Sequence, residues 1–213
     1  MRSSTAVPAL LFVVILAHLD CPAGEADDRS LFNGTNLEGW ETIEFGGSGE
    51  VKVLQGKLII SSGVELSGIR YTQPEKLPTT DYEVEIEARR SSGFDFFTAL
   101  TFPVGDLKTC ATFVVGGWGG GVVGISSING LDASENNTTS YMHFDEGPWY
   151  AIRLRVTATR IEGWIKDQKV VDEDITDKEI SLRSGQIDMC APFGIATFQT
   201  TGEIRKCVIR RLP

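Results

Sequence analysis

The most polar segment of the sequence carries side chains that could move a proton. The stretch "NGLDASENNTTSYMHFDEG", residues 129–147, contains Asp132, Glu135 and His143. Carboxylates and imidazoles are common general bases in enzymes, and functional groups concentrate on loops that a rigid scaffold carries. These three residues are therefore the candidate bases. A solvated acidic loop without any chemistry is the alternative.

A run of glycines, "VVGGWGGGVVG", surrounds Trp118. Residues 119–124 satisfy the GxGxxG spacing of dinucleotide sites, but such a site lies between a strand and a helix, and no helical period follows here. The run instead predicts two strands joined by a tight glycine turn, where bare backbone allows close approach. Trp118 at the tip could stack on a sugar ring or fill the core.

Alternation in "FDFFTALTF" predicts a strand with two unlike faces. One face would carry Phe94, Phe96, Leu100 and Phe102, and the other Asp95, Phe97 and Thr101. Asp95 would then project away from the core, where it could hydrogen-bond a ligand or simply face solvent. We also expect the glycine turn and residues 131–137 to lie together at one edge of the sheet.

The first 26 residues are typical of a signal peptide. Arg2 precedes the apolar block "ALLFVVILA", and small-residue steps at Ala23 and Ala26 offer cleavage sites. The block is far shorter than the roughly 20 residues of a spanning helix, and no later segment approaches that length. The sequence thus predicts a secreted or periplasmic protein without a membrane span; a lipid anchor on Cys21 is the less favoured alternative.

The net charge of the chain indicates which kinds of binding partner to expect. The 213 residues carry a formal net charge of −9. A negative domain repels phosphate backbones, so nucleic acid is not expected as a partner. Neutral sugars or cations fit better.

Few residues are available for a metal centre. After removal of the leader, His143 is the only histidine, which excludes a His-rich cluster. Ca²⁺ held by Asp132, Glu135 and loop carbonyls is chemically reasonable, although no EF-hand spacing supports it. No cofactor is certain, and a divalent cation stays an open possibility.

Three cysteines remain after the leader, and an odd number allows at most one internal bridge. We expect that bridge between Cys110 and Cys190. Cys207 is then an apolar core residue, as free cysteine commonly is.

Strands dominate the rest of the chain. "DYEVEIEARR" and "YAIRLRVTATR" alternate apolar and charged residues, the pattern of half-buried antiparallel strands. "RIEGWIKDQKVVDEDI" predicts a hairpin through "KDQK", and "FGIATFQTTGEIRKCVIRRL" a closing hairpin through "TTGE". Turn signals recur about every dozen residues, which favours a β-sandwich. With no linker or repeat, residues 27–213 form one predicted domain.

The start of this domain, "SLFNGTNLEGW", combines turn signals with apolar anchors. Asn33-Gly34 and Glu38-Gly39 predict turns. Leu31, Phe32, Leu37 and Trp40 could pin the segment onto the sandwich.

"SLFNGTNLEGW" also resembles the opening signature of the 3-keto-disaccharide hydrolases, described too as 3-keto-glycoside lyase/hydratase domains. The likeness resumes in "DYEVEIEARRSSG", "GPWYAIRLRVTATRIEGWIKDQKVVD" and "GIATFQTTGEIRKCVIRRL". It implies an all-β, concanavalin-like jelly-roll β-sandwich of two antiparallel sheets. The middle departs from the family pattern, because no segment resembling "EVQILD" follows the first long strand, so no catalytic residue is carried over.

The resemblance implies cleavage of 3-keto-glycosides by base-catalysed elimination and hydration. The C3 ketone acidifies the C2 hydrogen; a base removes it, the C1 substituent leaves, and water adds. We favour Glu135 as the base, over Asp132 for its reach and over His143 because acidic neighbours favour the protonated imidazole. Asn136 or a divalent ion could stabilise the enolate.

A non-catalytic glycan-binding or interaction module on the same sandwich is the second hypothesis. It needs only aromatic platforms and polar rims, which Trp118, Trp149, Asp95 and Asn137 could supply. A two-carboxylate glycosidase is a third possibility, but its test is the separation of the two carboxylates, which the sequence does not give.

Overall fold

The computed structural model describes Met1 and residues 28–213. The predicted leader therefore lies outside the described residues and stays a prediction. The described chain holds strands and two short 3₁₀ helices, η1 (Pro74–Lys76) and η2 (Gln186–Cys190), and none of its helices is long and apolar enough to cross a membrane.

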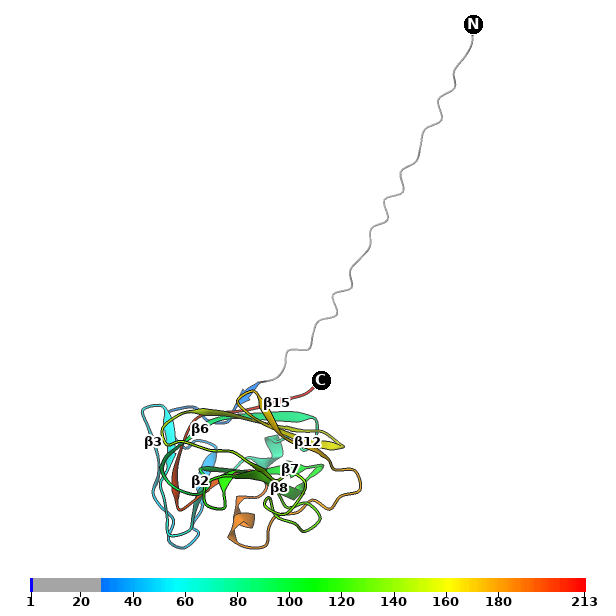
Figure 1. Ribbon diagram of the computed structural model, residues 1–213. Helices are drawn as coiled ribbons and strands as arrows, with labels where there is room; N and C mark the ends of the chain where they lie inside the picture. Colours follow the sequence, from blue (N-terminus) through cyan, green and yellow to red (C-terminus); the bar gives the residue numbers. More distant parts are fainter. Residues whose placement is uncertain (2–27) are drawn as a thin grey trace.

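The strands form two antiparallel sheets that lie one above the other (Figure 1). The eight-stranded sheet contains β13 (Gln168–Asp174), β12 (Arg160–Ile165), β11 (Tyr150–Val156), β6 (Tyr82–Gly93), β15 (Thr200–Arg211), β4 (Lys57–Ile60) and β3 (Val51–Leu54) in that order, with β1 (Arg29–Ser30) beside β15. The seven-stranded sheet contains, in order, β10 (Ser140–Tyr141), β9 (Val122–Ser126), β8 (Asp106–Gly117), β7 (Thr98–Val104), β14 (Gly194–Phe198), β5 (Leu66–Tyr71) and β2 (Trp40–Thr42). The predicted fold class, an all-β jelly-roll sandwich of concanavalin type, is confirmed.

The core lies between the sheets because their strands alternate as the sequence predicts. Val84 and Ile86 of β6 are buried opposite Leu154 and Ile152 of β11. Side chains two residues apart in a strand share a face, so each strand adds a row of apolar side chains to the core. The hairpin of β12 and β13 through "KDQK" is also confirmed.

The predicted closing hairpin through "TTGE" is wrong. β14 pairs with β5 and β7 in the seven-stranded sheet, whereas β15 pairs with β4 and β6 in the eight-stranded sheet. Gln199, with φ of 46°, turns the chain from one sheet into the other, and "TTGE" lies inside β15. An alternating pattern is the same in either sheet, so it does not reveal that a strand changes sheets.

The N-terminal anchor has the predicted role. Leu31, Phe32 and Trp40 are buried, and the Trp40 indole Nε1 donates to the Leu31 carbonyl at 2.7 Å. Gly34 and Gly39 have positive φ values of 76° and 81°, as turns that favour glycine require. The segment therefore closes one end of the core.

The predicted Cys110–Cys190 disulfide is wrong, because Cys110, Cys190 and Cys207 are all buried free thiols. The Cys110 thiol faces the carbonyls of Leu107 and Pro192, at 3.7 and 3.8 Å. Burial raises the pKa of Cys110 to about 11 and that of Cys190 to about 12. Such thiols stay protonated and are poor nucleophiles.

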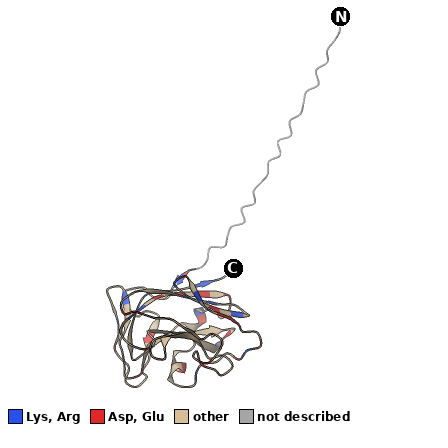
Figure 2. Cartoon of the chain, in the orientation of Figure 1, with Lys and Arg blue, Asp and Glu red and all other residues tan. Residues whose placement is uncertain are grey.

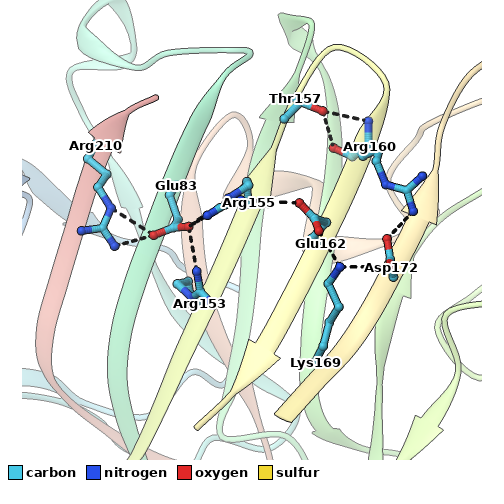
Figure 3. A network of polar contacts seen from close by, with 9 residues as sticks. All are labelled: Glu83, Arg153, Arg155, Thr157, Arg160, Glu162, Lys169, Asp172 and Arg210. Carbon is cyan, nitrogen blue, oxygen red and sulfur yellow. Dashed lines mark hydrogen bonds and ion pairs between the residues drawn. The ribbon is translucent and has the colours of Figure 1, made fainter. Parts of the chain in front are cut away.

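The outer face of the eight-stranded sheet is covered by ion pairs. Glu83 of β6 is only 3 % exposed and accepts hydrogen bonds from Arg153, Arg155 and Arg210 of the two flanking strands, at 3.0–3.1 Å. Figure 3 shows this carboxylate between the arginines and a second group of ion pairs around Lys169. The arrangement ties β11, β6 and β15 together across the sheet.

We predict that Glu83→Gln lowers the free energy of unfolding by roughly 3–5 kcal/mol, the usual cost of removing one partner from a buried ion pair. Burial alone raises the pKa of Glu83, but the hydrogen bonds of Arg210 and Arg155 outweigh it and hold the pKa below its ordinary value. The stabilisation is therefore complete above the unfolded pKa of about 4.3 and is lost as pH falls through the lower folded value.

Urea denaturation at neutral and acidic pH measures this effect. Asp172→Asn is the matched control, because that carboxylate is exposed and solvent screens its ion pair, so its loss should change stability far less. Equal losses for the two variants would contradict the role of Glu83.

Candidate functional site

A cavity of about 370 Å³ lies on the outer face of the seven-stranded sheet, within the size range of small-ligand sites. Its floor is formed by Ala99, Thr112, Val114 and Ser126, which come from three neighbouring strands. These side chains are small, so they leave room above the sheet. Residues 183–187, which include the start of η2, form the opposite wall. η2 packs against β5 and β14 beneath the lower sheet in Figure 1.

The cavity has two chemically different ends. Asp95, Trp118 and Arg183 lie at one end, where the Arg183 guanidinium carbon is 5.8 Å from the centre of the Trp118 ring. The other end is apolar and is lined by Leu66, Ile187 and Phe198. Phe96 lies between the two ends, because it packs against Val114 on one side and the Phe198 ring on the other. A ligand that fills the cavity is therefore expected to be polar at one end and apolar at the other.

Asp95 is held rigidly at the polar end. It is 8 % exposed, its Oδ1 accepts from the backbone N–H of Phe96 at 2.8 Å, and its Oδ2 accepts from Gly119 N–H at 2.8 Å. Each carboxylate oxygen has two lone pairs, so one acceptor site on each oxygen is left for a ligand. The carboxylate is thus fixed in place and still able to bind.

Arg90 ties together the segments around Asp95. Its Nη2 donates to the carbonyls of Asp95 and Gly120, at 3.0 and 3.2 Å, and its Nη1 donates to the Phe144 carbonyl at 3.3 Å. The guanidinium is buried and lies over the Phe97 ring at 5.6 Å. Burial lowers the pKa of Arg90, and the Asp95 and Glu146 carboxylates oppose that shift, so the group remains charged.

Trp118 occupies the tip of the predicted glycine turn, which joins β8 to β9. Its φ is 49°, and Gly119 and Gly120 follow with φ of 83° and 109°. A Cβ at Gly120 would lie 2.6 Å from the Phe94 carbonyl, so the close approach requires glycine. Trp118 itself is 42 % exposed, which leaves its ring accessible for stacking.

Asp132 lies just behind the polar end. Its Oδ1 accepts from the Ser126 hydroxyl at 3.2 Å, and its Oδ2 pairs with Arg183 Nε at 3.4 Å. Because Ser126 and Arg183 line the cavity, Asp132 acts on it through them. Arg183 also links this loop to Trp118, so the turn and the loop lie together at one edge as expected.

The other predicted site residues lie elsewhere. Glu135 and Asn137 are exposed, and neither lines the cavity. Asn136 donates from its amide to the carbonyls of Ile125 and Leu131, which shapes the loop. The His143 side chain is 86 % exposed and pairs with Asp145 at 3.0 Å.

Trp149 lies on the outer face of the other sheet. Arg89 and Arg205, which belong to β6 and β15, stack on its ring at 4.7 and 4.5 Å. The structure therefore brings Asp95, Trp118 and Asp132 together and keeps Trp149 apart from them.

The predicted faces of "FDFFTALTF" are wrong before residue 98. β7 begins only at Thr98, and the bend before it breaks the alternation. Phe97 is consequently buried in the core, Phe96 lines the cavity and Phe94 is exposed. Asp95 still faces the ligand side, but a bend and two backbone amides place it there.

Sequence reasoning missed Arg90 and Arg183. A signal for Arg90 was present, because it continues the inward-facing positions of Val84, Ile86 and Ala88 in β6, where a charge is rare. Arg183 had no such signal. It lies in an irregular segment, and only the fold brings it to the cavity.

Within residues 28–213, no group of three or more His, Cys, Asp and Glu side chains is placed to hold a metal ion. Asp132 pairs with Arg183, whose positive charge opposes a cation at that carboxylate. The Asp132–Glu135 calcium site considered from the sequence therefore does not fit these side-chain positions.

Comparison with known proteins identifies relatives of the whole sandwich. A family model described as 3-keto-alpha-glucoside-1,2-lyase-like domain matches residues 27–204. A search of curated proteins gives no significant match. Similar solved structures include a candidate glycosyl hydrolase of Parabacteroides distasonis, with a TM-score of 0.53, 12% identity, and 87% of this chain and 94% of the other covered.

Two further structures have the same fold. The carbohydrate-binding module CBM66 of Bacillus subtilis has a TM-score of 0.51 and 18% identity, with 81% of this chain and 95% of the module covered. Domain 4 of an extracellular GH43 arabinanase of Geobacillus stearothermophilus, solved with arabinotriose, has a TM-score of 0.54 and 13% identity, with coverage of 86% and 90%. At such identities the likeness establishes the fold alone.

We predict that Arg90→Lys loosens the polar end of the cavity. A lysine ammonium cannot reproduce the planar fork that reaches three carbonyls, so buried acceptors lose their donors, at a cost of roughly 1–3 kcal/mol each. Amide hydrogen exchange of residues 119–121 should accelerate, and the unfolding midpoint in urea should fall.

Arg89→Lys is the matched control for this prediction. Arg89 is the next residue along β6, but it points outward and pairs with Glu203 at 2.7 Å. Its substitution should leave exchange in the turn unchanged. Identical exchange rates in the turn for Arg90→Lys and the wild type would contradict the anchoring role.

Proposed function

The chain belongs to the family of 3-keto-alpha-glucoside-1,2-lyase-like domains, and from this premise we propose that it cleaves 3-keto-glycosides by elimination in the cavity beside Trp118. The family match bears out the resemblance of the framework motifs, and it extends across the divergent middle segment. The observation that carries the proposal is the fixed Asp95 carboxylate, which lines one end of the cavity together with Trp118 and Arg183.

The proposed chemistry needs a base, a group for the enolate oxygen and a platform for the sugar. Asp95 takes the proton from C2, and the C2–H electrons pass to the C3 oxygen as an enolate. When these electrons return, the C1–C2 double bond forms, the C1–O bond breaks, and the leaving oxygen takes up a proton from water. Arg183 supplies positive charge near the C3 oxygen, where negative charge develops. Trp118 stacks on the ring, and water then adds to the unsaturated sugar.

Asp95 is preferred to Glu135 in this proposal because of position. Asp95 and Glu65 are the carboxylates among the residues that line the cavity, and Glu65 is exposed at its mouth. Glu135 is exposed on the loop and lines no part of the cavity. A general base must come within hydrogen-bonding reach of the proton it removes, which favours the residue inside the cavity.

A glycan-binding module is the second candidate. Both oxygens of Asp95 already accept backbone N–H bonds, an arrangement suited to holding a sugar hydroxyl without any reaction. The printed descriptions of two structural relatives, a carbohydrate-binding module and an arabinanase domain in complex with arabinotriose, are in keeping with this role.

We predict that purified protein releases the aglycone from a 3-keto-glucoside and not from the unoxidised parent. Asp95→Asn should lower turnover by roughly 10²–10⁴-fold, the usual contribution of a general base. Affinity should fall as well, because the Asn amide nitrogen cannot accept the N–H bond of Phe96 or Gly119, so the comparison is made on kcat at saturating substrate. Glu135→Gln is the matched control and should keep wild-type turnover.

Two outcomes would contradict the proposed role of Asp95. If Glu135→Gln loses turnover and Asp95→Asn keeps it, Glu135 is the general base and Asp95 is not. Saturable binding of the glucoside without release of the aglycone in the wild type would favour the binding module. Circular dichroism of each variant verifies that the fold is intact.

A further inference from the structure

The apolar end of the cavity offers almost nothing to a sugar hydroxyl. Leu66, Phe96 and Phe198 line it from β5, the bend before β7, and β14, and the rings of Phe96 and Phe198 lie 5.8 Å apart at 39°. Ile187 of η2 closes the side away from the sheet. A hydroxyl buried here would lose its bonds to water and gain no partner, which is costly.

The polar groups near this end are engaged or turned to solvent. Gln186 lines the cavity, but its amide Nε2 donates to the Phe45 carbonyl at 2.8 Å. Glu65 is exposed at the mouth. The charged hydrogen-bonding groups that are buried or fixed enough to orient a sugar ring are therefore those at the opposite end, around Asp95 and Arg183.

This asymmetry orients a glycoside within the cavity. When the sugar ring lies on Trp118 with C2 near Asp95, the polar end of the cavity is occupied. The group attached to C1 then extends into the remaining space between Phe96, Phe198 and Ile187. Flat apolar groups fill such a space well, because aromatic rings pack favourably against one another at these separations.

We propose that the preferred substrates are 3-keto-glycosides whose C1 substituent is an aromatic or similarly flat apolar group, rather than a second sugar. This inference rests on the proposed function for its reaction, but its physical basis is the apolar end of the cavity. Phe96 and Phe198 are then specificity-determining residues that contact the leaving group.

Competition between three substrates that differ only at C1 tests the proposal. The substrates are the 3-keto derivatives of phenyl α-glucoside, methyl α-glucoside and maltose oxidised on its non-reducing ring. Phenoxide is intrinsically the better leaving group, so each kcat/KM is divided by the rate constant for elimination of the same compound in alkali without protein. We expect this normalised kcat/KM for the phenyl compound to exceed that of the other two by roughly 10- to 100-fold, the range that apolar pocket contacts supply. Equal values, or a preference for the disaccharide, would overturn the proposal.

Substitutions at the apolar end should remove this preference specifically. Phe198→Ala should bring the phenyl and methyl compounds to similar kcat/KM values once each is normalised to its elimination rate without protein. Ile187→Asn, at a less buried position, adds hydrogen-bonding groups and should shift preference toward the disaccharide. Phe94→Ala is the matched control, because Phe94 is exposed and does not line the cavity; it should keep the wild-type order. A preference that survives in both cavity variants would contradict the assignment.

Binding of the unoxidised glucosides separates this inference from the proposed function. If no keto substrate is turned over, the proposed elimination fails, and calorimetry with phenyl α-glucoside, methyl α-glucoside and maltose still tests the cavity. Tighter binding of the phenyl compound, abolished by Phe198→Ala, would support the apolar end as the site of the C1 group. Equal affinities would overturn it.

Discussion

A buried guanidinium is stable only when hydrogen-bond acceptors surround it, and the Arg90 guanidinium donates to three backbone carbonyls. These carbonyls belong to Asp95, Gly120 and Phe144, which lie in three separate connections at one edge of the sandwich. Their spacing is set by the planar fork of one side chain. The position of the Asp95 carboxylate and of the Trp118 turn therefore depends on a residue that does not itself line the cavity.

The two outer faces of the sandwich have opposite chemistry. On the eight-stranded sheet, charged side chains of neighbouring strands pair across the surface. Figure 3 shows one group of these pairs, and Figure 2 marks where Lys, Arg, Asp and Glu lie along the strands. Its two exposed-side tryptophans, Trp149 and Trp164, are covered by arginines, with Arg153 only 3.8 Å above the Trp164 ring. On the seven-stranded sheet, small uncharged residues such as Ala99 and Thr112 leave space that a loop encloses. On this second face, Trp118 is 42 % exposed and offers part of its ring to a ligand.

Features that depend on local sequence pattern were predicted correctly. Features that depend on contacts between distant segments were not. Alternation in β6 and β11 predicted the core, and the glycine run predicted the turn of Trp118, because both follow from the periods and backbone preferences of neighbouring residues. The crossing at Gln199 and the contact of Arg183 with Asp132 depend on which sheets and loops come together. Glu135 and Asp132 have the same chemistry in one loop, and only the fold determines which of them approaches the cavity. Arg90 is the exception among these site residues, because the alternation of β6 alone places it on the inward face, where a charged residue is unusual.

The location of a bound glycoside tests this account most directly. A crystal structure with phenyl α-glucoside should have the sugar ring against Trp118, a hydroxyl on the Asp95 carboxylate and the phenyl group between Phe96 and Phe198. Density for the glycoside on the outer face of the eight-stranded sheet, at Trp149 or Trp164, with the cavity left to water, would contradict the claim that Arg90 organises the binding site of this protein.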